Sequence, residues 1–253
     1  MQSNASTEGE RGDPVAEQIV IDHRFRGPPK SGNGGYVCGL LAAYVEGTAE
    51  VTLRLPPPID TPLDVVRSGA GAKLMSGDKL VAEAQPIEVE VDAPPAPSWD
   101  EAVAAAKRGR TERTNLQYNS CFVCGLDRGP GDGLCIFPGS LDGTKTMAAT
   151  WEPDTTVSDP DGVVPPEIVW AALDCPSGFP YIEPTGLVIL GRLAVKRIET
   201  VRRGERYVVL GWPTGQDGRK LYSSSALYTA SGKLCAVSKA TWIQLDEIPP
   251  GTT

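Results

Sequence analysis

The sequence predicts an α+β fold in which two similar units follow one another, each with one helix wrapped by antiparallel strands. Three observations lead to this prediction. A strand, a helix and a run of strands occur twice in the same order. The sequence MSGDKL at residues 75–80 matches TASGKL at residues 229–234, and both are typical of a tight hairpin. A proline-rich run, Asp92–Pro97, separates the two units.

The first unit is expected over residues 17–92 and begins with a strand at Glu17–Phe25. Its helix is expected at Gly34–Val45, where small residues allow close packing. Ala49–Leu55 alternates apolar and polar side chains, as a half-buried strand does. Turn signals at Pro56–Pro58 and Gly77–Asp78 separate the remaining strands, which are expected at Leu63–Arg67, Ala70–Met75 and Lys79–Val91.

A linker with a short helix is expected over residues 93–114. Ser98 is suited to cap this helix, over Trp99–Arg108, because its hydroxyl can accept a hydrogen bond from a free backbone N–H. The second unit is expected over residues 115–247, and its longer spacing between helix and hairpin predicts longer central strands or loops. Its elements are expected at Thr144–Trp151 (strand), Pro165–Leu173 (helix, ended by Cys175–Gly178), Leu187–Ile198, Tyr207–Trp212, Leu221–Ala230 and Lys233–Leu245 (strands).

The composition is that of a globular protein, with 253 residues, of which 40% are hydrophobic and 22% charged. The net charge of −8 argues against nucleic acid as a partner, because phosphates demand a basic face. No segment approaches the ~20 apolar residues of a membrane span, and the polar first residues lack the apolar core of a signal peptide. We therefore expect a cytoplasmic protein with a disordered tail over residues 1–16 and a second tail over residues 248–253.

The two predicted helices begin in different ways. The first begins at Asn33-Gly34-Gly35 and the second at Pro165-Pro166-Glu167. A helix start has unpaired N–H groups and a partial positive charge, so it can stabilise an oxyanion. Glycine lets a ligand approach the backbone, whereas proline has no N–H to donate. When the helices are aligned at Asn33 and Pro165, the second carries Asp174 about where the first carries Ala42, so the two helices together can build one site.

Asp174 is a candidate for acid–base or nucleophilic chemistry. It follows Trp170–Leu173, and such apolar surroundings raise the pKa of a carboxyl group. Its expected place in the last turn of the helix is also unfavourable for a negative charge. A carboxylate in such a place can act as a nucleophile or as a base on water. The structural alternatives are a local bond from Asp174 to a backbone donor and a pure packing role for Gly34 and Gly35.

Several segments resemble one protein family. Gly34–Ala42 followed by Val51–Pro58 resembles the first half of tandem, double-hotdog thioesterase-like proteins. Asn33-Gly34-Gly35 resembles the His-Gly-Gly helix start of hotdog acyl-CoA thioesterases, with Asn in place of His. Ala171–Asp174 resembles the helix segment that bears the catalytic acid of the phenylacetyl-CoA-type branch, and Cys121–Gly125 with Gly133-Leu134 resembles the run that often precedes the first strand in that branch. The resemblance covers most of residues 18–246 and implies a pseudo-dimeric double hotdog with one continuous antiparallel sheet.

The resemblance implies an acyl-CoA thioesterase, a hydrolase of lipid metabolism that cleaves a thioester at one composite site between the two units. In this family a backbone N–H at the helix start polarises the carbonyl, and the facing helix supplies the acid. Here these roles fall to Gly34 or Gly35 and to Asp174. Asn33 is expected as the helix cap and as a further member of the catalytic set, with a direct substrate contact by its side chain as one possibility. Coenzyme A enters as part of the substrate, and no separate cofactor is implied. Further substrate contacts are expected from Tyr36, Thr241, Arg192, Lys196 and Arg197, the basic residues among them as partners for the phosphates.

The assembly state stays open at this stage. A duplicated hotdog supplies the usual dimer within one chain, so that a monomer and a homo-oligomer of the whole chain are both compatible with the sequence. A non-catalytic acyl-CoA or lipid-binding protein on the same fold is an alternative function, because Asn33 replaces His and Pro165-Pro166-Glu167 begins the second helix.

The cysteines and the single histidine suggest weaker alternatives. Cys121-x-x-Cys124 with Cys135 can start a tetrahedral zinc site. The fourth ligand would have to come from Cys38, Cys175, Cys235 or His23. A small zinc-ribbon interaction module around residues 115–140 is a third possible function. No second Cys-x-x-Cys exists, so buried, reduced thiols are favoured and no metal ligand is assigned. His23 is expected on a half-exposed strand, and with one histidine neither Ser-His-Asp nor Cys-His catalysis is expected.

Overall fold

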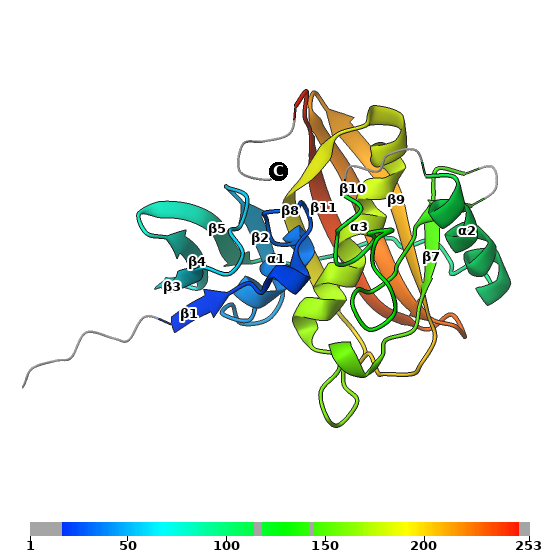
Figure 1. The fold of residues 1–253 in the computed structure, drawn as a ribbon, viewed down its shortest axis with the longest axis horizontal. Helices are drawn as coiled ribbons and strands as arrows, with labels where there is room; N and C mark the ends of the chain where they lie inside the picture. Colours follow the sequence, from blue (N-terminus) through cyan, green and yellow to red (C-terminus); the bar gives the residue numbers. More distant parts are fainter. Residues whose placement is uncertain (1–16, 114–117, 142–143, 248–253) are drawn as a thin grey trace, which may run out of the picture.

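The computed structural model describes residues 17–113, 118–141 and 144–247 (Figure 1). The tails expected at residues 1–16 and 248–253 lie outside the described residues. The strands are β1 (Glu17–Val20), β2 (Ala49–Leu53), β3 (Pro62–Ser68), β4 (Gly71–Ser76), β5 (Lys79–Pro86), β6 (Gly139–Ser140), β7 (Met147–Trp151), β8 (Val188–Arg197), β9 (Tyr207–Asp217), β10 (Lys220–Thr229) and β11 (Leu234–Gln244). The helices are α1 (Gly34–Ala42), α2 (Trp99–Thr111) and α3 (Pro166–Thr185), with short 3₁₀ helices at His23–Phe25 and Thr155–Val157.

The strands described form one antiparallel sheet with the order β1-β3-β4-β5-β2-β8-β11-β10-β9-β7-β6. This order contains the same arrangement twice. In the first unit the helix α1 follows β1, and the order is β1-β3-β4-β5-β2. In the second unit the helix α3 follows β7, and the order is β7-β9-β10-β11-β8. The duplication expected from the sequence is therefore present in the topology, with the matched hairpins at β4–β5 and β10–β11.

The two units join along β2 and β8, which pair antiparallel from Ala49 opposite Val195 to Thr52 opposite Arg192. The strands of the second unit are longer, because β8 to β11 have 10 or 11 residues whereas β2 to β5 have five to eight. The sequence predicted this asymmetry. One continuous sheet therefore spans both units, and neither unit has an edge at the junction.

Each face of the sheet has its own apolar cluster. The helices α1 and α3 pack on one face and against each other, and α3 lies across the longer strands of the second unit (Figure 1). The helix α2 packs beside β7 in a second cluster. Alternation along β9 produces this division, because Tyr207 and Val209 belong to the first cluster while Val208 and Leu210 belong to the second. The segment after β5 also reaches the second cluster, where Tyr228 Oη donates to Pro94 O at 2.6 Å.

The helix α3 differs most from the prediction. The sequence predicted an end near Cys175–Gly178, but the helix continues to Thr185 through Pro176, Pro180 and Pro184. Proline removes a backbone donor and leaves carbonyl groups without helical partners. Two buried serine hydroxyls bond helix carbonyl groups just before Pro176: Ser177 Oγ donates to Asp174 O and Ser225 Oγ donates to Leu173 O, each at 2.7 Å. The helix packs along β8 to β11 over this stretch, and Asp174 lies in its interior rather than in its last turn.

Other differences are limited to the ends of elements. The first strand stops at Val20 because Asp22 caps a 3₁₀ turn, its side chain accepting from Arg24 N. The strand β5 stops at Pro86. The strand β9 runs on through Pro213, where its pairing with β10 shifts register, and a proline is tolerated at such an irregularity. The helix α2 starts as predicted, with a full capping box between Ser98 and Glu101. No described helix meets the length and apolarity needed to cross a membrane.

Candidate active site

The start of α1 is fixed by its cap. Asn33 has an extended backbone, and its side-chain oxygen accepts from Tyr36 N at 2.9 Å. The backbone N–H of Asn33 donates to Phe25 O at 2.7 Å, so the cap is also tied to the turn before it. This arrangement leaves the side-chain amide of Asn33 free to donate in another direction. The N–H groups of Gly34 and Gly35, at the first two positions of the helix, have no acceptor within α1.

Asp174 from α3 meets this helix start. One carboxylate oxygen, Oδ2, accepts from Asn33 Nδ2 at 2.8 Å and from Gly35 N at 2.9 Å. The donors belong to the first unit and the acid to the second, so that the contact joins the two units at the point where α1 and α3 cross. The sequence predicted that Asp174 and the Gly34-Gly35 start complement each other, and the structure brings them into direct contact.

Glycines on α1 make this contact sterically feasible. A Cβ added to Gly35 would lie 2.5 Å from Asp174 Cβ and 2.7 Å from Trp170 O. One turn later, a Cβ on Gly39 would lie 2.5 Å from Glu167 Cα. Both positions therefore exclude any larger residue unless the helices move apart. The packing role that the sequence left open for Gly35 is real, and it accompanies the hydrogen bond to Asp174.

Asp174 is buried, with 2% of its surface exposed. Burial raises the pKa of its carboxyl group to about 7, the bonds from Gly35 and Asn33 oppose this shift, and the thiol of Cys121 adds to it. The other carboxylate oxygen, Oδ1, is buried and has no hydrogen-bond partner among the described residues. One oxygen is thus held in place by two donors, while the second remains available to a reacting group.

A cavity of about 330 Å³ opens beside Asp174. Asn33, Gly34 and Asp174 form its polar end, and no acceptor for the Gly34 N–H is found in the described part of the chain. Most of the wall is apolar, with contributions from Leu53, Ile182, Val188, Leu190, Trp242 and Ile243. Arg54 also lines the cavity, its guanidinium half exposed and paired with Glu83. The cavity therefore joins a carboxylate and a backbone donor to an apolar chamber.

The other expected contact residues lie away from this cavity. Tyr36 is buried in the core, where its ring stacks on Phe25 with centroids 4.1 Å apart, and it does not line the cavity. Thr241 and Arg192 line a different hollow, and neither lines the cavity of Asp174. Lys196 and Arg197 are exposed near the end of β8 and line neither hollow. The separation in β11 falls where its pairing with β8 shifts register, between Thr241 and Trp242.

The start of α3 lacks what the start of α1 offers. Pro165 caps α3 without a side-chain hydrogen bond, and Pro166 is its first residue. Neither proline has an N–H to donate. Pro165, Pro166 and Ala42 do not line the cavity that holds Asp174. The asymmetry between the two helix starts that the sequence indicated is thus retained in three dimensions.

Three cysteines gather behind Asp174. The sulfur atoms of Cys121, Cys124 and Cys175 all lie within 4.8 Å of one another, and the three residues are buried. Cys135, which the sequence grouped with Cys121 and Cys124, instead donates to Arg128 O, and Cys175 from α3 takes its place. The six cysteines are free thiols, as the sequence predicted. His23 is exposed, in a 3₁₀ turn rather than a strand, near Asp22 and Asp60.

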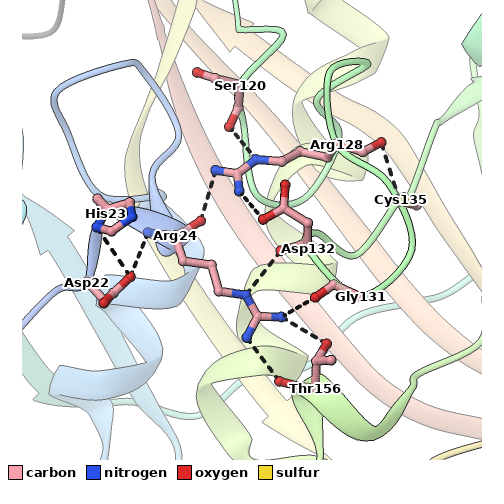
Figure 2. A network of polar contacts seen from close by, with 9 residues as sticks. All are labelled: Asp22, His23, Arg24, Ser120, Arg128, Gly131, Asp132, Cys135 and Thr156. Carbon is pink, nitrogen blue, oxygen red and sulfur yellow. Dashed lines mark hydrogen bonds and ion pairs between the residues drawn. The ribbon is translucent and has the colours of Figure 1, made fainter.

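The segment that carries Cys121 and Cys124 is docked on the first unit. Figure 2 shows two arginines that hold it: the Arg128 guanidinium donates to Ser120 O and Arg24 O and pairs with Asp132, and Arg24 donates to Gly131 O and Thr156. Phe122 is buried and packs edge-on against Phe25. This segment is part of the core and does not form a separate ribbon module.

Sequence reasoning missed several residues of the cavity wall. Arg54 and Trp242 lie on or next to predicted strands. A single sequence does not show which side of each strand faces Asp174. The sequence places Cys175 in a helix stop, because Pro176 and Gly178 follow it, and names it only as one of several possible zinc ligands. One signal could have identified Cys175 as a cavity residue: it directly follows the candidate acid Asp174 on the same helix.

The sheet order, the paired helices and the site at their crossing define a double hotdog. Three solved structures share this fold over most of their length. A candidate thioesterase from Novosphingobium aromaticivorans is 15% identical with a TM-score of 0.59, and the match covers 93% of this chain and 97% of that one. A thioesterase II candidate from Thermobifida fusca is 12% identical with a TM-score of 0.57, covering 91% and 93%. A tesB protein from Mycobacterium avium subs paratuberculosis is 13% identical with a TM-score of 0.53, covering 84% and 86%.

No protein-family model and no curated protein matches the chain. The likeness to the solved structures establishes the fold predicted from the sequence, including the continuous antiparallel sheet across both units.

Proposed function

We propose that this protein is an acyl-CoA thioesterase-like hydrolase with one composite site, in which Asp174 and the start of α1 act together. The single observation that carries the proposal is the contact of Asp174 Oδ2 with Asn33 and Gly35 at the polar end of an apolar cavity. A buried carboxylate beside a helix start offers a base and an oxyanion donor within one site. The thioesterase-type proteins that share the fold over most of the chain agree with this reaction class.

In the proposed reaction, Asp174 Oδ1 accepts a proton from water while the water oxygen attacks the thioester carbonyl carbon. The carbonyl oxygen becomes an oxyanion, which the Gly34 N–H and the positive end of α1 stabilise. The tetrahedral intermediate then breaks its carbon–sulfur bond. The leaving thiolate takes the proton back from Asp174, so that the products are a carboxylic acid and a free thiol. Asn33 and Gly35 hold Oδ2 throughout and thereby orient Oδ1.

The alternative chemical route uses Asp174 Oδ1 as the nucleophile, with a mixed anhydride as the intermediate that water then hydrolyses. Hydroxylamine distinguishes the routes, because it traps the anhydride as an acyl hydroxamate at the expense of free acid. Our proposal of water attack predicts that the yield of free acid per thiol released stays close to one when hydroxylamine is present at a concentration too low to attack the thioester directly.

The cavity also suggests the substrate class. A volume of about 330 Å³ lies at the lower end of the ~300–1,000 Å³ typical of ligand pockets. It suits an apolar acyl group and the adjacent thioester rather than a whole coenzyme A. The carrier would then extend to the surface past Arg54, whose half-exposed guanidinium can pair with a phosphate.

The direct test is release of free thiol from a panel of acyl-CoA thioesters of increasing chain length. Wild-type protein should hydrolyse at least one of them, and Asp174→Ala should lose on the order of 10²- to 10⁴-fold in kcat, as removal of an essential base does. Glu167→Gln is the matched control, because Glu167 lies two turns earlier on α3 and does not line the cavity. Equal rates for wild type and Asp174→Ala would refute the role of Asp174.

A non-catalytic acyl-CoA-binding protein is the second candidate. The observation that favours it is the Gly35 N–H, which donates to Asp174 and is therefore not free for a substrate. Such a protein would be stabilised against heat by a non-hydrolysable acyl-CoA analogue but would release no thiol from the matching thioester. Stabilisation together with turnover would exclude this candidate.

A further inference from the structure

The three thiols behind Asp174 come from two separate parts of the chain. Cys121 and Cys124 lie on one turn, and Cys175 lies on α3. The Cys121 and Cys175 sulfur atoms are 3.6 Å apart, and all three sulfur pairs are within 4.8 Å. Sulfur ligands about 2.3 Å from a tetrahedral zinc ion stand ~3.8 Å from one another. Three of the four corners of such a tetrahedron are therefore already close to their final positions.

We propose that Cys121, Cys124 and Cys175 bind one Zn²⁺ ion through three thiolates, with a water molecule from the cavity as the fourth ligand. All three cysteines line the cavity, so that a fourth position on this side is within reach of solvent. Asp174 is not part of the sulfur cluster, because its carboxylate oxygens are not within 4.8 Å of all three sulfur atoms. The carboxylate therefore stays a neighbour of the metal site rather than a ligand.

The turn that carries two of the ligands is rigidly held. Gly125 N donates to Cys121 O at 2.9 Å, and a Cβ at Gly125 would lie 2.2 Å from Asn119 O, so the turn requires glycine there. Phe122 N donates to Arg26 O at 2.8 Å, which anchors the turn to the first unit. The Cys-x-x-Cys spacing on such a turn is the one that zinc sites commonly use. The site is thus largely preformed and does not depend on a flexible loop closing.

The surroundings also suit thiolates. Asn33 Nδ2 lies 3.9 Å from Cys121 Sγ, as a donor to that sulfur. Arg113 Nη1 donates to Cys124 O at 2.7 Å, which places a positive charge beside the cluster. Three thiolates and Zn²⁺ carry a net charge of −1, which the guanidinium of Arg113 offsets. Tyr118 Oη, buried at the cavity wall, has no hydrogen-bond partner within the described ranges and can bond the metal-bound water.

This site does not depend on the proposed hydrolysis. The metal would link the turn of the second unit to α3, close to where the turn also contacts Arg26 of the first unit. Its primary effect is on stability, because the ion binds the folded chain and releases the thiol protons to solvent. Binding of zinc and hydrolysis of acyl-CoA can therefore fail independently.

The test is the metal content of the whole chain after reduction, incubation with zinc sulfate and dialysis. We expect about one zinc ion per chain, and cobalt in its place should give the sulfur-to-metal charge-transfer absorption of a thiolate site. Cys121→Ser, Cys124→Ser and Cys175→Ser should each lose most of the zinc. Cys135→Ser and Cys235→Ser should keep it, and Asp174→Asn should keep it as well.

The outcomes that would contradict the zinc site can be measured without an assay of enzymatic activity. Wild-type protein that stays free of zinc after this treatment, with a circular dichroism spectrum of a folded chain, contradicts the proposal. Equal loss of zinc in Cys135→Ser and Cys121→Ser contradicts the choice of ligands, and loss in Asp174→Asn contradicts the water ligand. A folded chain without metal and two hydrogen atoms lighter than the fully reduced mass, as oxidation by air during dialysis would leave it, would assign the cluster to a disulfide instead.

Discussion

At the scale of one residue, opposing effects set the pKa of the Asp174 carboxyl group. Two donors on Oδ2 favour the carboxylate, but burial disfavours the charge more strongly, and the pKa of the group lies near 7. A base with such a pKa is half ionised near neutral pH. It is then both present in its ionised form and basic enough to accept a proton, which favours general base catalysis. The arrangement therefore sacrifices folding stability for a group that can exchange a proton, as functional carboxylates commonly do.

The pKa of Asp174 sets a dependence of stability on pH. Because the folded-state pKa is above the unfolded value near 3.9, the native protein binds more protons between about pH 4 and pH 7. The stabilising effect of the protonated group is present below pH 4 and is lost as pH rises through 7. We expect Asp174→Asn to have a higher free energy of unfolding than wild type at pH 8, by on the order of 4 kcal/mol. The measurement is urea unfolding of both proteins in the presence of a metal chelator. The difference between the two proteins should shrink toward pH 5, and a difference that does not change with pH would contradict the burial of a charged Asp174.

At the scale of one element, α3 shows that tertiary packing can stabilise a helix that contains prolines. Local signals alone predicted a stop at Cys175–Gly178, since Pro176 and Gly178 are poor helix residues. The prediction was wrong because burial against β8 to β11 and bonds from Ser177 and Ser225 offset the local cost. Ser225 and the strands that cover α3 lie farther along the chain, so no local pattern could have indicated their contribution. The start of α1 was predicted well, because Asn33 and two glycines are strictly local signals.

Ser177 is the residue that tests this explanation. Its hydroxyl donates to Asp174 O and accepts from Trp242 Nε1 at 2.9 Å, and the side chain is fully buried. Ser177→Ala leaves the buried Trp242 indole N–H without a partner, so we expect a loss of about 1–3 kcal/mol in the free energy of unfolding. Ser231→Ala, on an exposed turn, should change it by less than about 0.5 kcal/mol. Similar values for the two variants would show that α3 does not rely on Ser177.

The whole molecule is two copies of one arrangement joined into a single core. The order of elements, the turn signals and the matched hairpins allowed the duplication and the sheet class to be predicted. The junction between β2 and β8 was implied only by the resemblance, since strand pairing between distant segments leaves no local trace. The cavity wall could not be predicted, and the sulfur cluster could be predicted only in part. The sequence grouped Cys121 with Cys124 and named Cys175 as one of four candidate partners, but only the packing of α3 on this turn selects Cys175 over Cys135.

The shared core predicts that both units unfold together. Leu193 of β8 is fully buried and lies opposite Val51 across the junction. Leu193→Ala should lower the free energy of unfolding by about 3 kcal/mol and keep one cooperative transition, since the cavity left behind weakens both units. Val103→Ala on the exposed face of α2 should have little effect. Calorimetry that resolves two transitions in wild type or variant would contradict a single folding unit.

The most direct measurement of the central claim is kcat of Asp174→Asn on the acyl-CoA that wild type hydrolyses fastest. The asparagine oxygen can still accept from Asn33 and Gly35, so that this variant removes the charge and leaves the packing nearly unchanged. Our interpretation predicts a fall of on the order of 10²- to 10⁴-fold, with Glu167→Gln near wild type and with binding of a non-hydrolysable analogue retained. Turnover by Asp174→Asn within a few-fold of wild type would contradict it.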